Sequence, residues 1–175
     1  MLHSIGTCLW FDGKAKEAAH FYKEVFGDVA IVSENPMAVV YNIYGRRFMN
    51  LNGGPGYPIN PSISFFISVD SEAEMDQIWE RLNVDGKILM PLNKYPWSER
   101  YGWVEDKYGM TWQLMLGDMP VSGQKITPSL LFVGEQFGKA QQAIKDYTNL
   151  FANSHIDNLQ MYGAQQPELE GNLLF

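Results

Sequence analysis

Histidine and cysteine are the side chains whose spacing most directly encodes metal or nucleophile chemistry, and this chain has few of them. It has three histidines, His3, His20 and His155, and one cysteine, Cys8. None of them forms an H-x-x-x-H, H-x-E or C-x-x-C pattern. Cys8 lies inside an apolar run, which is typical of a buried, inert thiol, and a lone cysteine fits a reducing compartment. The sequence therefore predicts no metal site and no cysteine chemistry.

Carboxylates are the next candidates for acid and base chemistry. Glu99, Glu105 and Asp106 gather in one polar hairpin, where they could serve an enzyme as general acid or base. The alternative, which we favour, is that they are solvated surface charges. The Gly-rich segment 52–58 could cradle a phosphate, but its prolines prevent a helix from following it. We therefore favour a turn of special backbone geometry for that loop.

Hydrophobic periodicity indicates which elements position these groups. Strands are expected at 5–11, 29–33, 38–44, 47–51 and 63–69, in a short stretch after Gly86, and at 102–105 and 110–116. Asp12 is expected to cap a helix that ends before Gly27, and Ser71 with Glu74 forms a capping box for a second helix. The order β-α-β-β-β occurs twice over within residues 1–117, which we interpret as a complete module of the βαβββ type.

A helical segment of this chain is written twice. The segment 14–26, KAKEAAHFYKEVF, recurs at 139–151 as KAQQAIKDYTNLF, and each copy follows an apolar run. Residues 118–125 have the composition of a linker, and 126–175 form a partial second module of strand, helix and strand. Such a half-module has to cover its apolar face on the first module or on a second chain. We therefore expect a homodimer, and exchange of the half-module between chains is one specific hypothesis.

The composition is that of an ordinary globular chain. Of its 175 residues 46% are hydrophobic, which is enough to build a core. The formal net charge of −7, without a basic stripe, argues against nucleic acid as a partner. No apolar stretch approaches the roughly 20 residues that span a bilayer, and the first residues lack a signal-peptide pattern. We expect a cytoplasmic protein whose partner is a small molecule and not a membrane.

Three strings of the sequence together resemble a known family. LWFDGKAKEAAHFYKEVFG, FMNLNGGP and GWVEDKYGMTWQL are similar to the PhnB-like family, whose members are often labelled 3-demethylubiquinone-9 3-methyltransferase. This family lies in the glyoxalase/bleomycin-resistance/dioxygenase (vicinal oxygen chelate) superfamily. The resemblance covers residues 4–117, and 126–175 resemble the opening of a second module. It implies an α+β fold of paired βαβββ modules with curved mixed sheets that enclose a cavity, often completed by dimerisation.

The resemblance also implies where a metal would bind. In metal-using members, a His on the first strand, a His on a middle strand and a Glu on the last strand hold a divalent ion. The corresponding positions here are Thr7, Ser64 and Gln113, which lack the imidazole and carboxylate groups that such ions prefer. The methyltransferase label would imply S-adenosylmethionine, but the sequence has no doubly wound unit to bind it. We expect neither a metal nor a cofactor.

Strand alternation then suggests a cavity lined by neutral polar and aromatic groups. If Thr7 and Gln113 face that cavity, Trp10 and Trp112 belong to the core under the helices. The expected cavity residues are Thr7, Leu9, Asn50, Asn52, Ser64, Phe66, Trp97, Trp103, Thr111 and Gln113, with Tyr101 near the mouth. Such a lining suits a flat, moderately polar organic ligand. The alternative is that these are core and hairpin residues of a protein without a ligand.

Two classes of function remain open from the sequence. The first, which we favour, is a metal-free binding protein similar to the drug-sequestering members of the superfamily. The second is an enzyme that acts on a small organic substrate, a methyltransferase or glyoxalase-like enzyme by the resemblance. A third variant is an enzyme whose metal ligands come from a partner chain. Stoichiometric binding without turnover would distinguish the first class from the others.

Overall fold

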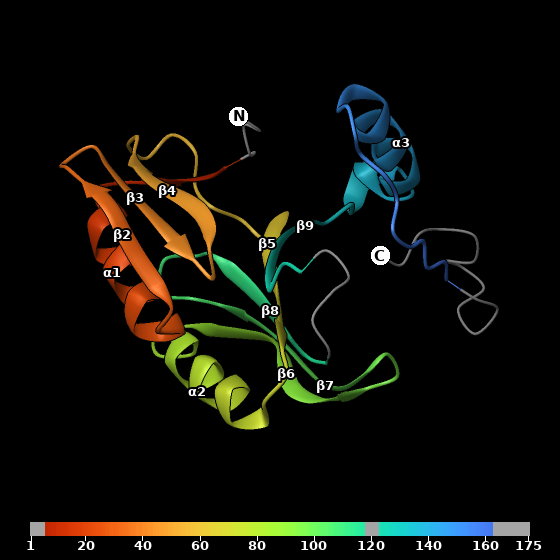
Figure 1. Cartoon of the computed structure of the whole chain (residues 1–175), viewed down its shortest axis with the longest axis horizontal. Helices are drawn as coiled ribbons and strands as arrows, with labels where there is room; N and C mark the ends of the chain where they lie inside the picture. Colours follow the sequence, from red (N-terminus) through yellow and green to blue (C-terminus); the bar gives the residue numbers. More distant parts are fainter. Residues whose placement is uncertain (1–5, 118–122, 163–175) are drawn as a thin grey trace. The chain divides into compact units, whose positions relative to one another are not determined.

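The computed structural model describes residues 6–117 and 123–162, so His3, most of the expected linker and the end of the expected half-module lie outside the described residues (Figure 1). The elements are β1 (Thr7–Phe11), α1 (Ala15–Phe26), β2 (Val29–Glu34), β3 (Ala38–Ile43), β4 (Arg46–Asn52), β5 (Ile63–Val69), α2 (Glu72–Leu82), β6 (Lys87–Tyr95), β7 (Ser98–Glu105), β8 (Thr111–Leu116), β9 (Ile126–Leu130), the 3-10 helix η1 (Gly134–Gln136) and α3 (Ala140–Leu150). Within these residues, no helix has the length and apolar character to cross a membrane.

The strands form two mixed sheets, and the four strands of each β-α-β-β-β run have the same order, with β9 added to the second sheet. Sheet A has the order β1-β4-β3-β2, and sheet B has the order β6-β7-β8-β5-β9. In each sheet the first strand of a β-α-β-β-β run lies parallel to the last strand, as β1 does with β4 and β5 with β8. The α+β class and the βαβββ order expected from the sequence are confirmed.

Helix α1 covers one face of sheet A. Its buried residues recur at helical spacing and include Ala18, Tyr22 and Phe26, and the helix ends at Gly27, whose φ of 71° suits glycine. The expectation that Asp12 caps this helix is wrong, because no side chain at the cap position makes a hydrogen bond. Instead the amide oxygen of Asn52, at the end of β4, accepts from the backbone N–H of Ala15 at 2.9 Å.

Helix α2 covers the equivalent face of sheet B. The hydroxyl of Ser71 accepts from the backbone N–H of Glu74 at 3.4 Å, as the capping box predicts. Residues Met75, Ile78 and Leu82 are buried against the sheet. The apolar face of α2 therefore packs against sheet B along the length of the helix.

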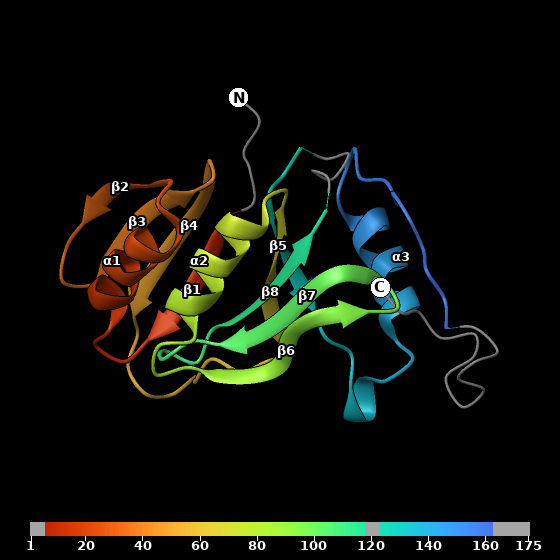
Figure 2. The same cartoon turned by 90° about the horizontal axis from the view of Figure 1, so that it is seen from below.

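The helix-covered faces of both sheets share one aromatic core. Trp112 of β8 lies 5.2 Å from Tyr22 and 4.9 Å from Phe26, measured between ring centroids. Phe65 of β5 meets Phe48 of β4 at 5.0 Å. All five side chains are at most 6% exposed, so the core joins residues from both β-α-β-β-β runs. Figure 2 shows α1 with the strands β2, β3 and β4 on the left and β5, β6, β7 and β8 to their right.

The chain divides into two compact units. The first is Met1–Leu130 and the second is Leu131–Phe175. Strand β9 belongs to the first unit, because it pairs antiparallel with β5 and buries Ile126 in the core. The second unit contains η1 and α3, and none of the residues of these two helices is buried.

Candidate functional site

The expected cavity residues of sheet A lie on its helix-covered face and hold α1 in place. Leu9 is 7% exposed and belongs to the core. Asn50 is fully buried, where its amide donates to the carbonyl of Ala15 at 3.0 Å and accepts from the hydroxyl of Tyr41 at 2.8 Å. Thr7 pairs with Phe48 in the parallel register and is half-buried. The structure therefore places these residues, with Asn52, at the contact between sheet and helix.

The position of Trp10 shows that the sequence-based assignment of the two faces of β1 to core and cavity is reversed in the structure. Alternation along β1 correctly separates Leu9 and Phe11 from Trp10, but α1 covers the face that carries Leu9 and Phe11. The expectation that Trp10 belongs to the core is wrong, whereas Trp112 is fully buried as expected. The indole N–H of Trp10 instead donates to the carbonyl of Gly54 at 2.7 Å.

The expected residues of sheet B come together on the face opposite α2. In the strand register Ser64 lies beside Thr111, Phe66 beside Gln113, and Trp103 beside Gln113. Paired residues on neighbouring strands point to the same side of a sheet. The structure thus brings these five expected residues onto one face.

Three neutral side chains on that face form a continuous hydrogen-bonded line, which we call the polar row: Ser64, Gln113 and Tyr101. The amide nitrogen of Gln113 donates to the hydroxyl of Ser64 at 2.7 Å. The hydroxyl of Tyr101 donates to the amide oxygen of Gln113 at 2.6 Å. Burial raises the pKa of Tyr101, so its phenol stays protonated and serves as a donor. Gln113 is half-buried, so the row is partly open to solvent.

Aromatic side chains flank the polar row. The ring of Phe66 lies 6.5 Å from that of Tyr101, and the exposed Trp97 lies 5.9 Å from Tyr101. The indole N–H of Trp103 is buried and has no hydrogen-bond partner within residues 6–117 and 123–162. A buried donor without a partner costs roughly 1–3 kcal/mol, so it marks a place where a ligand acceptor would be stabilising.

The polar row does not fit a divalent metal. Ser64 and Gln113 are neutral, and their polar atoms already bond to each other and to Tyr101. Thr7, the third position implied by the resemblance, lies in the other sheet. Across the described part of the chain, no three His, Cys, Asp or Glu side chains gather in an arrangement that could hold a metal ion.

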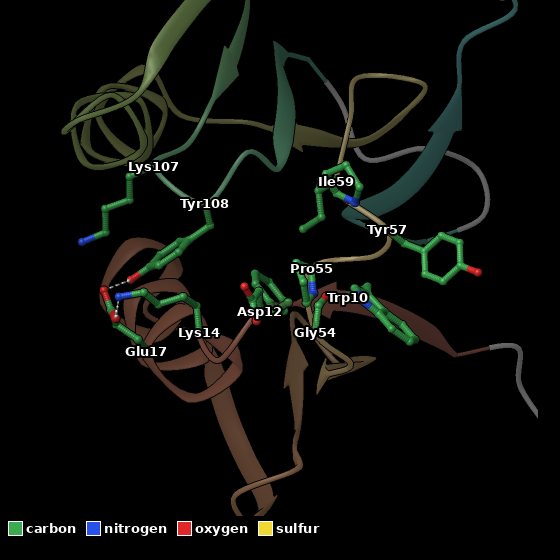
Figure 3. Close-up of a pocket in the computed structure, with 12 residues that line it drawn as sticks. Trp10, Asp12, Lys14, Glu17, Gly54, Pro55, Tyr57, Ile59, Lys107 and Tyr108 are labelled. Atoms are coloured by element: carbon green, nitrogen blue, oxygen red, sulfur yellow. Dashed lines mark hydrogen bonds and ion pairs between the residues drawn. The ribbon is translucent and has the colours of Figure 1, made fainter.

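A second region, which we call the loop pocket, lies where β1 leads into α1 (Figure 3). It has a volume of about 500 Å³ and is bordered by the loop after β4 and by the turn between β7 and β8. The lining residues are Trp10, Phe11, Asp12, Lys14, Glu17, Gly54, Pro55, Tyr57, Pro58, Ile59, Lys107 and Tyr108. Sequence patterns singled out one of its three segments, the Gly-rich loop, but did not predict the pocket, because the segments are far apart along the chain.

The β7–β8 turn beside the loop pocket is organised by Asp106. This carboxylate is 3% exposed, so the expectation of a solvated surface charge is wrong for Asp106. One oxygen accepts from the indole N–H of Trp112 at 2.8 Å, and the other accepts from the backbone N–H groups of Tyr108 and Met110. Glu99, in contrast, is exposed and pairs with Lys94, as expected for a surface charge. The D-x-x-G turn followed by Trp112 was the available sequence signal.

Comparison with known proteins identifies similar sequences and folds. A family model described as 3-demethylubiquinone-9 3-methyltransferase matches residues 3–115. A putative 3-demethylubiquinone-9 3-methyltransferase, PhnB protein, from Bacillus cereus is 35% identical, with 66% of this chain and 100% of that chain covered and a TM-score of 0.61. No curated protein matches the sequence.

Two further solved structures share the fold. A protein from Pseudomonas aeruginosa is 24% identical, with 66% of this chain and 98% of that chain covered and a TM-score of 0.56. A glyoxalase-related enzyme from Fulvimarina pelagi is 21% identical, with 76% of this chain and 100% of that chain covered and a TM-score of 0.51. At this identity the likeness concerns the fold alone.

Proposed function

The chain belongs to the 3-demethylubiquinone-9 3-methyltransferase family, and from that premise we propose that it is a metal-free protein that binds a small organic molecule. Family and fold place the chain in the glyoxalase/bleomycin-resistance superfamily. The ligand would lie on the face of sheet B that carries the polar row. A second copy of the chain would help to enclose it.

The observation that carries this proposal is the unpartnered indole N–H of Trp103 beside the polar row. Gln113 lies directly opposite Trp103 in the register of β7 and β8. A ligand carbonyl could accept from the Trp103 nitrogen while its ring packs against Phe66. The site would then recognise a flat molecule with carbonyl acceptors.

The family description suggests the first ligand to test. It names 3-demethylubiquinone, whose quinone ring is flat and carries two carbonyl oxygens. Those features match the unpartnered donor of Trp103 and the aromatic side chain of Phe66. We therefore propose a quinone or a related ring ketone as the ligand class.

The methyl transfer named by the family description does not fit the fold. S-adenosylmethionine usually binds at the switch point of a doubly wound parallel sheet. Here, both sheets are mixed, and the Gly-rich loop after β4 leads through Pro55 and Pro58 into strand β5 and not into a helix. We therefore propose binding of the ring without transfer of a methyl group.

Calorimetry with a short-chain 3-demethylubiquinone analogue tests the proposal. Trp103→Phe keeps an aromatic ring but removes the N–H, so we expect binding about 2- to 12-fold weaker, the effect of one hydrogen bond. Trp79→Phe, on the helix side of the same sheet, is the matched control and should bind as the wild type does. Added zinc or chelator should leave the affinity unchanged.

Two results would count against this function. Equal affinity of the wild type and Trp103→Phe for the quinone analogue would show that the indole N–H does not bind the ligand. A methylated product detected by mass spectrometry after incubation with S-adenosylmethionine would favour the enzymatic alternative.

A further inference from the structure

The loop pocket is separate from the proposed quinone site, because none of the polar row lines it (Figure 3). Its volume of about 500 Å³ lies in the range of small-molecule sites, roughly 300–1,000 Å³. Aromatic and proline side chains make up much of its wall, and they include Trp10, Tyr57 and Pro55. The charged groups of the lining therefore decide which ligand it can take.

The positive charges of the loop pocket are already engaged. The ammonium of Lys14 lies 2.9 Å from a carboxylate oxygen of Glu17. The other oxygen of Glu17 accepts from the hydroxyl of Tyr108 at 2.9 Å. The ammonium of Lys107 lies 4.7 Å from the ring centre of Phe21, a cation–π distance. Lys14 is therefore ion-paired, whereas Lys107 lies over an aromatic ring.

Asp12 is the charged group of the pocket that has no partner among the described residues. No hydrogen bond or ion pair to its carboxylate occurs in residues 6–117 and 123–162. Figure 3 shows Asp12 in the middle of the pocket, between the Lys14–Glu17 pair and Trp10. The carboxylate is therefore available to a ligand that brings a positive charge.

The aromatic wall beside Asp12 suits the same ligand. Trp10 and Tyr57 meet edge to face, with ring centroids 5.4 Å apart. The indole of Trp10 is held by its hydrogen bond to Gly54 and by close packing on Gly53. Ring faces near a carboxylate attract organic ammonium groups through cation–π interaction. The net charge of −7 for the whole chain favours cations at longer range.

We propose that the loop pocket binds a small organic amine, with its ammonium group on Asp12 and its apolar part on Trp10, Tyr57 and Pro55. Both the charge and the shape of the ligand would determine its affinity for the loop pocket. A neutral analogue would lose the ion pair, and a carboxylate analogue would meet the Asp12 charge.

Three probes with the same phenyl group test the assignment by titration calorimetry: phenethylamine, phenylethanol and 3-phenylpropionate. We expect the amine to bind about tenfold more tightly than the alcohol, and the carboxylate more weakly than either, because the ion pair forms only with the amine. The indole N–H signal of Trp10 should shift in the NMR spectrum on titration with the amine. If all three probes bind equally, or if none binds, the proposal fails.

Asp12→Asn is the decisive variant, since it removes the charge and keeps the shape. We expect the affinity for phenethylamine to fall about tenfold and that for phenylethanol to stay the same. Asp28→Asn, an exposed aspartate outside the pocket, is the matched control and should bind both probes as the wild type does. A melting curve for each variant confirms folding.

A second variant keeps the test decisive if Asp12→Asn misfolds. Lys107→Gln removes a nearby positive charge, so the amine should bind as tightly as before or more tightly. Tighter binding of 3-phenylpropionate than of the amine, with loss on Lys107→Gln, would overturn the proposal and identify an anion site.

Discussion

Asp106 shows how much one buried carboxylate can organise. Both of its oxygens accept hydrogen bonds, from the Trp112 indole on one side and from the backbone of the turn on the other. The sequence placed this residue on the surface because charged residues in a hairpin are usually solvated. The donors lie within six residues of Asp106, in the turn at Tyr108 and Met110 and on Trp112, so the D-x-x-G turn followed by Trp112 is the local pattern that indicates a buried carboxylate.

Asp106→Asn should destabilise the protein by about 1–3 kcal/mol. An amide has one acceptor oxygen, so either the indole N–H or the turn amides would lose their partner. Urea unfolding at neutral pH measures the change, and the exposed Asp28→Asn serves as control. A variant as stable as the wild type would contradict the assigned role of Asp106.

The raised pKa of Asp106 also predicts how the stability difference between the wild type and Asp106→Asn changes with pH. Burial raises the pKa of Asp106 above its ordinary value of 3.8, against the opposing effect of its hydrogen bonds. A carboxyl group with a higher pKa in the folded state stabilises the fold below that ordinary value and loses the contribution as pH rises through the raised pKa. The difference in unfolding free energy between wild type and Asp106→Asn should therefore shrink as pH rises above about 3.8.

Gly53 offers a second test at the level of one residue. A Cβ atom on Gly53 would lie 2.1 Å from the indole of Trp10, which is far inside contact distance. Gly53→Ala should therefore displace the indole and destabilise the protein by about 1–3 kcal/mol. Gly56→Ala in the same loop meets open space and is the matched control. Thermal unfolding and tryptophan fluorescence report both effects, and equal melting of the two variants would contradict the close approach.

At the level of elements, the helices were the most predictable part of the fold. Apolar spacing and the Ser71 capping box located α1 and α2 from local sequence alone. The cap of α1 could not be found in this way, because its acceptor, Asn52, is 37 residues from Ala15. Local patterns report on contacts within an element but not on partners brought in by tertiary structure.

The strands illustrate a related limit. Alternation correctly separated the two faces of β1 and of β8, but it does not say which face a helix covers. For sheet B, the assumed face agrees with the structure, and Ser64, Phe66 and Gln113 lie together. For sheet A, the face assumed to line a cavity is the face that α1 covers, because Leu9 and Asn50 lie under that helix.

At the level of the whole molecule, the second unit has more apolar surface than it covers. Tyr147 and Leu150 of α3 are 50% and 72% exposed, whereas the matching residues of α1, Tyr22 and Val25, are at most 2% exposed. A monomeric protein rarely leaves such a helix face open. We propose that a second copy of the chain covers it in a homodimer.

Leu150→Glu tests this assembly. A charge on the apolar face of α3 should dissociate the dimer, which light scattering at micromolar concentration would detect as a halved mass. Asn149→Glu, on an exposed neighbouring position of the same helix, adds the same charge and should leave the mass unchanged. A monomeric wild type, or a dimer that tolerates Leu150→Glu, would contradict the proposal.

The pairing of β9 with β5 has a consequence for synthesis on the ribosome. Strand β5 lies between β8 and β9, and Ile126 completes the core beside it. Until residues 126–130 leave the exit tunnel, the nascent chain carries an open strand edge at Ile63–Val69. Such edges recruit other chains, so this one depends on prompt elongation or on a chaperone to shield it. Translational pausing just before Ile126 would prolong the interval in which the newborn protein is most prone to aggregate.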